Sequence, residues 1–203
     1  MQIIVLTQDN PIKHEIDTIN KLLDNGLEKI HIRKPSFSLK EYREYILQIK
    51  KEYYTRIVLH GGFDLLKEYE IGGIHLNSIQ RKDEKLYSTV ANNNISISAS
   101  THSWDEVLEE KKRFEYLFIS PVFDSISKEG YTASIDLNGL GVVKQKLAIK
   151  NLYCPKIIGL GGVNVPHIPI LKQYQFDGAA VYGAIWRSTN PLAILNGLLA
   201  MAK

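Results

Sequence analysis

Short apolar runs alternate along the chain with longer segments whose apolar residues recur at helical spacing. The short runs are apolar at nearly every position and rich in β-branched residues, as expected of strands that are buried on both faces of a parallel sheet. The predicted strands are Gln2–Thr7, Lys29–Arg33, Arg56–His60, Gly73–Leu76, Ile95–Ser98, Tyr116–Ser120, Lys156–Leu160 and Gly178–Tyr182.

The segments between these strands predict helices. Regular amphipathic patterns cover Ile12–Asn25, Ser38–Lys51, Ser103–Phe114, Asp136–Leu147, Val165–Gln173 and Pro191–Ala202, and less regular ones cover Asp64–Glu70 and Arg81–Asn92. Such βα alternation requires a parallel sheet. About eight βα units in 203 residues predict one α/β domain, residues 1–203, folded as a (β/α)8 TIM barrel. An open, doubly wound sheet is the alternative.

Composition narrows the class of protein. The chain is 44% hydrophobic and 23% charged, as ordinary globular proteins are, and its net charge of +3 is too small to favour nucleic acid or a membrane as a partner. The first residues, MQIIVLTQDN, are typical of a strand and not of a signal peptide. The single cysteine, Cys154, excludes a disulfide within the chain and fits a reducing compartment, so we expect a cytoplasmic protein.

Polar side chains collect at the ends of the predicted strands, where a (β/α)8 barrel carries its active site. His31 and Arg33 end the second strand, and because neighbours on a strand alternate, these two side chains share one side. The other polar residues at or just beyond strand ends are His60, His75, Ser100 and His102. We expect them to line a pocket at the mouth of the barrel, although any single histidine could instead be structural.

Two glycine loops follow the last two predicted strands. Gly161 and Gly162 come after the seventh strand, and Tyr182 and Gly183 come after the eighth. Loops after these strands, together with a short helix N-terminus, are the usual phosphate site of a (β/α)8 barrel, because glycine exposes backbone amides to an anion. The alternative is that the glycines only make tight turns.

The segment after the sixth strand is a second candidate for anion binding. It is a long polar stretch before the next helix, and such loops in compact domains usually serve a function. Ser125, Ser127 and Lys128 could donate hydrogen bonds to a phosphate or a pyrophosphate. A solvated surface loop is the alternative.

Several segments together resemble one known family. Ile97–Ser103 is similar to its G-x-S-x-H-S segment, Tyr116–Lys128 to D-Y-x-x-x-G-P-x-F-x-T-x-T-K, Gly159–Val163 to A-I-G-G-I, Asp177–Ile185 to D-G-V-A-V-x-S-A-I, and Gly73–Leu76 to G-V-H-L. These pieces occur in family order and span nearly the whole chain. They resemble the thiamine phosphate synthase and thiazole tautomerase (TenI) superfamily, which implies a (β/α)8 barrel that binds a thiazole phosphate at the two glycine loops.

The chain departs from the synthase pattern at the residues that bind metal. The resemblance implies that a synthase joins a pyrimidine pyrophosphate to a thiazole phosphate with Mg²⁺ held by aspartates. Here His60 and Gly61 stand where the family has N-D, and the run that ends at Gln80 stands where it has G-Q-x-D. Both expected carboxylates are missing, so we expect no metal and no cofactor.

We therefore interpret the chain first as a tautomerase-like enzyme, since the resemblance implies a branch that isomerises a carboxythiazole phosphate without metal. The family's catalytic histidine falls on His102, whose imidazole suits proton transfer near neutral pH. Arg33 would hold the substrate carboxylate, and Lys128 belongs to the lysine-x-glycine pattern of this branch. The two glycine loops would bind the phosphate.

Two other interpretations stay open. In a thiamine phosphate synthase with a rearranged Mg²⁺ site, the departing pyrophosphate would be stabilised by Arg33, Ser100, Ser125, Ser127 and Lys128. In the second, the protein binds a phosphorylated ligand without catalysis. In every case we expect a phosphorylated small molecule as the partner, neither nucleic acid nor a membrane, and a homodimer as the family's usual assembly.

Overall fold

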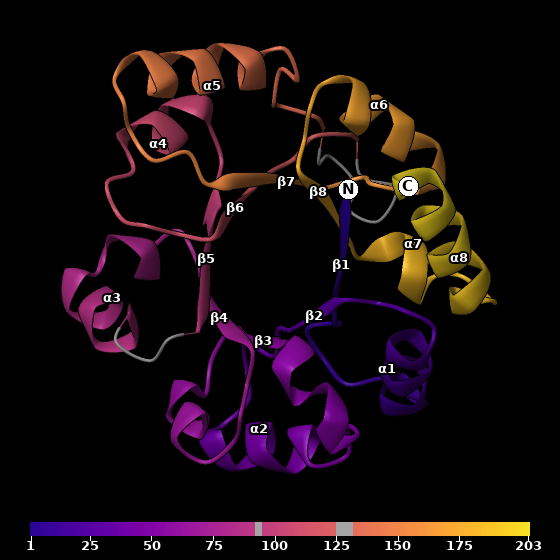
Figure 1. Cartoon of the computed structure of the whole chain (residues 1–203). Coiled ribbons are helices and arrows are strands. Elements are labelled where there is room, and N and C mark those ends of the chain that lie inside the picture. Colours follow the sequence, from indigo (N-terminus) through magenta and orange to yellow (C-terminus); the bar gives the residue numbers. More distant parts are fainter. Residues whose placement is uncertain (92–94, 125–131) are drawn as a thin grey trace.

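The structure, a computed structural model, describes residues 1–91, 95–124 and 132–203. Eight parallel strands follow one another around a closed barrel, and the helices surround it (Figure 1). The strands are β1 (Gln2–Leu6), β2 (Lys29–Ile32), β3 (Ile57–Leu59), β4 (Gly73–Leu76), β5 (Ser96–Thr101), β6 (Tyr116–Ile119), β7 (Lys156–Leu160) and β8 (Gly178–Val181). The predicted (β/α)8 barrel is confirmed, and the open sheet is wrong.

The helices lie outside the barrel in chain order. The α-helices are α1 (Glu15–Asp24), α2 (Leu39–Ile46), α3 (Glu84–Ala91), α4 (Trp104–Glu109), α5 (Gly139–Ile149), α6 (Ile168–Gln173), α7 (Gly183–Trp186) and α8 (Pro191–Ala202). The 3₁₀ helices are η1 (Lys51–Arg56), η2 (Phe63–Lys67), η3 (Gln80–Lys82) and η4 (Val165–His167). None of the described helices is both long enough and apolar enough to cross a membrane.

Several predicted helices are shorter in the structure. The first begins at Glu15 and not at Ile12, because His14 takes a left-handed conformation with φ of 61° that interrupts the helix. The capping box of Ser38 and Glu41 starts α2 as predicted, but the helix ends at Ile46. The segment predicted as a helix over 64–70 is largely the 3₁₀ helix η2.

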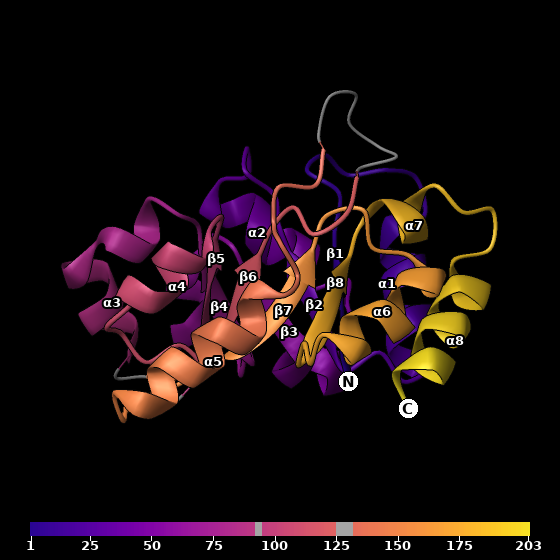
Figure 2. The same cartoon turned by 90° about the horizontal axis from the view of Figure 1, so that it is seen from above.

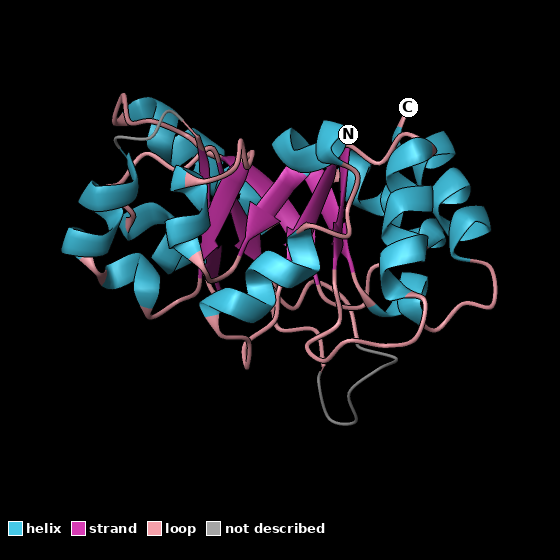
Figure 3. Cartoon of the chain, turned by 90° about the horizontal axis from the view of Figure 1, so that it is seen from below, coloured by secondary structure: helices cyan, strands magenta, loops and turns pink. Residues whose placement is uncertain are grey.

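The strands all point the same way, so their carboxyl ends meet at one rim of the barrel. The closing pair, β1 with β8, runs in register from Gln2 opposite Gly178 to Val5 opposite Val181. The two labelled chain ends lie near the other rim, away from α7 (Figure 2). The loops that leave the strand ends extend beyond the sheet on the far side from these termini (Figure 3). The functional groups predicted at the strand ends therefore share one face.

The barrel interior is divided into an apolar and a polar half. Side chains that face inward from β1, β6, β7 and β8 form a small apolar cluster that includes Ile4, Phe118 and Ile158. The other half is polar, because β2 and β4 place the fully buried side chains of His31 and His75 inside the barrel. A buried polar group is stable only when it is hydrogen-bonded, so the polar half must satisfy its own donors and acceptors.

A buried ion pair fastens the first loop to the second strand. The Lys34 ammonium donates to both oxygens of Glu15, at 3.0 and 2.7 Å, and to the Gln8 carbonyl at 2.6 Å. The two charged side chains are 0% and 1% exposed. Lys34 thus points away from the mouth, toward α1, as the alternation along β2 predicts. Glu15 also accepts from the Gln8 amide at 3.1 Å, which fixes the loop between β1 and α1.

We predict that Glu15→Gln lowers the free energy of unfolding by about 3–5 kcal/mol, because it leaves the buried Lys34 ammonium without its counter-charge. The control is Asp64→Asn, which breaks an exposed pair with Lys67 whose side chains are 68% and 80% exposed. That change should cost less than about 1 kcal/mol. Urea unfolding of both variants measures the difference, and equal losses would contradict the role given to the buried pair.

Candidate active site

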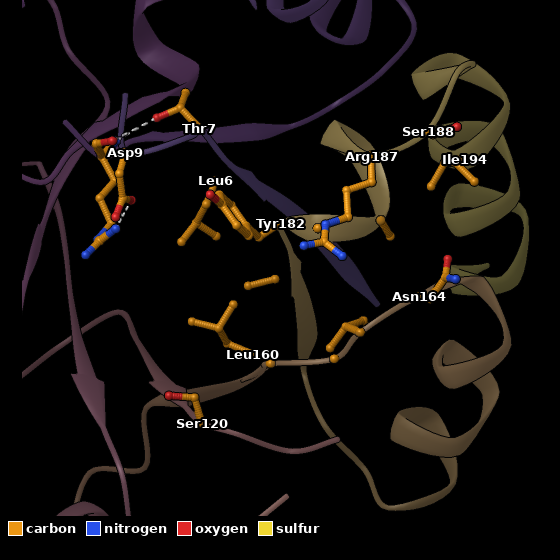
Figure 4. Close-up of a pocket in the computed structure, with 17 residues that line it drawn as sticks. Leu6, Thr7, Asp9, Ser120, Leu160, Asn164, Tyr182, Arg187, Ser188 and Ile194 are labelled. Carbon is orange, nitrogen blue, oxygen red and sulfur yellow. Dashed lines mark hydrogen bonds and ion pairs between the residues drawn. The ribbon is translucent and has the colours of Figure 1, made fainter. Parts of the chain in front are cut away.

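A cavity of about 490 Å³ opens at the carboxyl ends of the strands, between the loops of β1, β2, β6, β7 and β8 (Figure 4). It is lined by Leu6, Thr7, Asp9, Arg33, Ser120, Leu160, Gly161, Gly162, Val163, Asn164, Ala180, Tyr182, Gly183, Ala184, Arg187, Ser188 and Ile194. The structure thus brings both predicted glycine loops and Arg33 to one cavity. Its size suits a small phosphorylated molecule.

The loop after β7 needs glycine at both positions. Gly161 and Gly162 have φ of 97° and 64°, a region that other residues rarely adopt. A Cβ on Gly161 would lie 2.8 Å from Pro121, and one on Gly162 would lie 2.4 Å from the Asp124 carbonyl oxygen. The loop runs this close to the β6 segment because the Phe123 amide donates to the Gly161 carbonyl at 3.1 Å.

Three backbone amides at the cavity have no acceptor among the described residues. They are the amides of Gly162, Gly183 and Ala184. The amides of Gly183 and Ala184 belong to the first turn of α7, whose N–H groups lack partners within the helix. Amides from two loops that line one cavity are the arrangement that binds phosphate in other proteins.

Arg187 supplies a positive charge that the sequence analysis missed. It follows α7, and its guanidinium reaches into the cavity beside Tyr182 (Figure 4). A guanidinium favours phosphate through charge and through its fork of donors. The sequence signal for this residue was its spacing, because Arg187 stands four residues after Gly183, one helical turn from the predicted phosphate loop. In the structure the Arg187 amide donates to the Gly183 carbonyl at 3.0 Å.

Arg33 lies at the opposite edge of the cavity, held by the loop after β1. Its guanidinium forms an ion pair with the Asp9 carboxylate. Its backbone amide donates to the Thr7 hydroxyl at 2.9 Å, which ties the ends of β1 and β2 together. Asp9 therefore competes with any anionic substrate for Arg33, and binding of such a substrate would require the pair to separate.

His31, His60 and His75 lie next to the cavity but do not line it. The Nδ1 of His31 is 2.9 Å from Nε2 of His60, and the Nε2 of His31 is 2.8 Å from the Tyr116 hydroxyl. Burial is the main cause that lowers the pKa of all three imidazoles, that of His75 to about 3, and the other two well below the ordinary value. At neutral pH these imidazoles are uncharged.

The remaining predicted residues are His102 and Ser100, which the structure describes, and Ser125, Ser127 and Lys128, which it does not. The Nδ1 of His102 lies 3.2 Å from the Ser120 carbonyl oxygen and 3.3 Å from the Ser120 hydroxyl. Because a carbonyl can only accept, Nδ1 carries the proton and Nε2 can accept one. Ser100 contacts His75, through a hydrogen bond of 2.8 Å. Ser125, Ser127 and Lys128 lie outside the described residues.

The described donor set does not fit Mg²⁺. This ion prefers carboxylate oxygens, and the one carboxylate among the described lining residues, Asp9, is paired with Arg33. Asp64 is exposed and accepts from Lys67 at 2.9 Å. The Gln80 side chain accepts from the Asn77 amide at 3.1 Å, so its oxygen is used within the local turn.

Fold and site together define a (β/α)8-barrel protein with a glycine-lined cavity at the carboxyl ends of its strands. The chain belongs to the thiamine monophosphate synthase family, whose model matches residues 1–185.

Individual relatives agree with this family. The chain is 23% identical, over 186 residues, to the thiamine-phosphate synthase of Desulfitobacterium hafniense, covering 90% of this chain and 86% of the relative. The crystal structure of thiamine phosphate pyrophosphorylase from Bacteroides thetaiotaomicron superposes with a TM-score of 0.74 at 27% identity, covering 100% of this chain and 98% of the other. The corresponding Pyrococcus furiosus structure, with a TM-score of 0.77 at 22% identity and 99% and 95% coverage, supports the fold alone.

We predict that Gly162→Ala weakens the binding of inorganic phosphate by at least about tenfold, or about 1.4 kcal/mol. The added Cβ meets the Asp124 and Phe123 carbonyl oxygens at 2.4 and 2.6 Å, so the loop must move. Calorimetric titration with phosphate measures the effect.

Gly141→Ala is the matched control, because Gly141 lies in α5 and an added Cβ would have no neighbour within 4 Å. It should leave phosphate affinity unchanged. Equal affinities in all three proteins would remove the β7 loop from the anion site.

Proposed function

We propose that this protein is a transferase of thiamine biosynthesis that joins a pyrimidine pyrophosphate to a thiazole phosphate. The observation that carries the proposal is the meeting of two glycine loops and Arg187 in one cavity, within a chain of the thiamine monophosphate synthase family. The tautomerase interpretation, preferred from the sequence, gains no support from the relatives named above, which carry the name of the synthase.

The thiazole phosphate would sit in the cavity with its phosphate toward α7. The amides of Gly162 and Gly183 would donate to the phosphate oxygens, and Arg187 would balance their charge. Leu6 and Leu160, which also line the cavity, would contact the ring. This arrangement fixes the phosphate end and leaves the ring directed toward the barrel axis, where the second substrate must arrive.

The pyrophosphate would be held at the opposite edge. In the condensation, the bond between the pyrimidine methylene carbon and the pyrophosphate oxygen breaks, and the oxygen leaves with the electron pair. The methylene carbon then bonds to the thiazole nitrogen. Groups that stabilise negative charge on the leaving oxygen therefore accelerate the step. Arg33 would supply a positive charge beside the leaving oxygen once its ion pair with Asp9 has separated. Ser125, Ser127 and Lys128 stay predicted partners of the pyrophosphate.

A thiazole tautomerase is the second candidate, because one observation favours it. The described residues offer no carboxylate set for Mg²⁺, and a tautomerase needs none. In that reaction Nε2 of His102 would accept the proton, with Nδ1 held by Ser120. A protein that binds the phosphate without catalysis is the third candidate, and the same experiment separates all three.

The deciding assay supplies the purified protein with a pyrimidine pyrophosphate, a thiazole phosphate and Mg²⁺. We expect thiamine phosphate to form, and its fluorescence after oxidation measures the yield. A parallel reaction contains only the non-aromatic carboxythiazole phosphate, with wild type and His102→Ala. If the carboxythiazole phosphate is converted and no thiamine phosphate forms in the first reaction, the protein is a tautomerase. If neither reaction occurs but the thiazole phosphate raises the melting temperature, the protein binds its ligand without catalysis.

Arg187→Ala should raise KM for the thiazole phosphate by about tenfold or more, since a charge-assisted hydrogen bond to phosphate contributes roughly 1.5–3 kcal/mol. Arg187→Lys should recover part of this, because it restores the charge but not the planar fork. Arg113→Ala is the control, since Arg113 stacks on Tyr153 and precedes β6 at the other rim. An unchanged KM in Arg187→Ala would place the phosphate elsewhere.

A further inference from the structure

Three histidines, from β2, from just beyond the end of β3 and from β4, meet inside the barrel, and His31 pairs in register with Leu6, which lines the cavity. One ring nitrogen from each of His31, His60 and His75 lies within 4.8 Å of the other two. His31 and His75 are buried, and His60 is half-buried just beyond the end of β3. We propose that these imidazoles form a binding site for a transition-metal dication of the Zn²⁺ or Co²⁺ class, which goes beyond the transferase function and does not rest on it.

The hydrogen bonds around His75 place its ring proton on Nδ1 and its lone pair on Nε2. The Ser98 hydroxyl donates to the Ile74 carbonyl at 3.2 Å, so its oxygen accepts from Nδ1 of His75 at 2.8 Å. The lone pair of His75 therefore lies on Nε2, where it accepts from the Ser100 hydroxyl at 2.8 Å. Histidine ligands of metals are held in this way, with one nitrogen bound to a neighbour and the other directed at the ion.

The same division holds for His31. Its Nε2 lies 2.8 Å from the Tyr116 hydroxyl, and its Nδ1 lies 2.9 Å from Nε2 of His60. In the metal-free protein one proton lies between these two nitrogens. On metal binding, the ring that carries this proton would take its other neutral tautomer, with the proton on its outer nitrogen, so that both inner lone pairs face the ion. Tyr116 and Ser98 would then be the outer contacts that orient two of the three ligands.

Metal binding requires the imidazole rings to reorient. In a tetrahedral site with metal–nitrogen distances of about 2.1 Å, the nitrogens are about 3.4 Å apart. That separation falls between the 2.9 Å of the hydrogen-bonded pair and the 4.8 Å limit of the cluster. His60 and His75 are stacked, with centroids 4.4 Å apart and an angle of 21° between planes. They must turn about χ2, a torsion with broad minima, before their lone pairs converge.

The donor set selects the kind of metal. Three neutral nitrogens without a carboxylate suit Zn²⁺, Co²⁺ and Ni²⁺, and they disfavour Mg²⁺ and Ca²⁺, which prefer oxygen. Three histidines also leave a fourth position open. The Ser100 hydroxyl, displaced from His75 Nε2, would lie beside that position and could hold a water there. The nearby charge of Arg33 is balanced by Asp9, so it does not bar a dication.

The test uses the tag-free full chain after treatment with EDTA. Calorimetry should show one equivalent of Zn²⁺ binding with a Kd of about 1 µM or lower. Co²⁺ should give the intense visible absorption of a tetrahedral nitrogen site, and Mg²⁺ should not compete with either ion. A wild-type chain that binds no stoichiometric Zn²⁺ overturns the proposal, whatever the variants do.

Two variants locate the site. His60→Ala removes the half-buried ligand, and His75→Gln keeps an amide that can hydrogen-bond to Ser98 and Ser100. Each should weaken Zn²⁺ binding by about 100-fold or more. The control is His14→Asn, because the His14 side chain is exposed and Asn tolerates its left-handed φ. Folded variants, judged by circular dichroism, that retain wild-type affinity would overturn the assignment to these residues.

Discussion

Closure of the parallel ladder between β1 and β8 is the constraint on which the rest of the structure depends. The pairing in register of Gln2 with Gly178 places the loop after β8 beside the loop after β1. The pairing of Leu160 with Ala180 does the same for the loops after β7 and β8. Small residues make this possible, because a Cβ on Gly178 would lie 2.8 Å from the Gln2 carbonyl oxygen. Groups far apart in sequence therefore share one cavity.

The same closure makes the barrel interior costly to fill with polar groups. His31 lies against Phe118, with ring centroids 4.9 Å apart, at the border between the apolar and the polar half. In the described part of the chain, no ring nitrogen of the three clustered histidines is among the buried polar atoms without a partner. The polar half persists because its imidazoles hydrogen-bond to one another and to the hydroxyl groups of Tyr116, Ser98 and Ser100. A cluster of this kind holds its members in place, and so supplies preorganised nitrogen ligands.

Much of this architecture could be predicted from the sequence, since it depends on local patterns. The limits of β4 and β7 match the predicted Gly73–Leu76 and Lys156–Leu160, and the opposite directions of Arg33 and Lys34 follow from alternation along one strand. What depends on tertiary contacts could not be predicted. The left-handed His14 shortens α1. Arg187 shares a cavity with Arg33 and Gly161 only because the loops after β8, β2 and β7 meet at one rim. The hydrogen bond between His31 and His60 depends on the register of β2 and β3, which places the two side chains at the same level of the barrel.

The pair of Lys34 and Glu15 has a consequence for how this chain can change over time. Each charge sits in a site that water does not reach, and each is tolerated only because the other is present. A replacement at one position alone leaves the other charge buried and unpaired, whereas joint replacement by two apolar residues of similar volume can be neutral in stability. Drift at these two sites is therefore correlated, and descendants would inherit either both charges or neither.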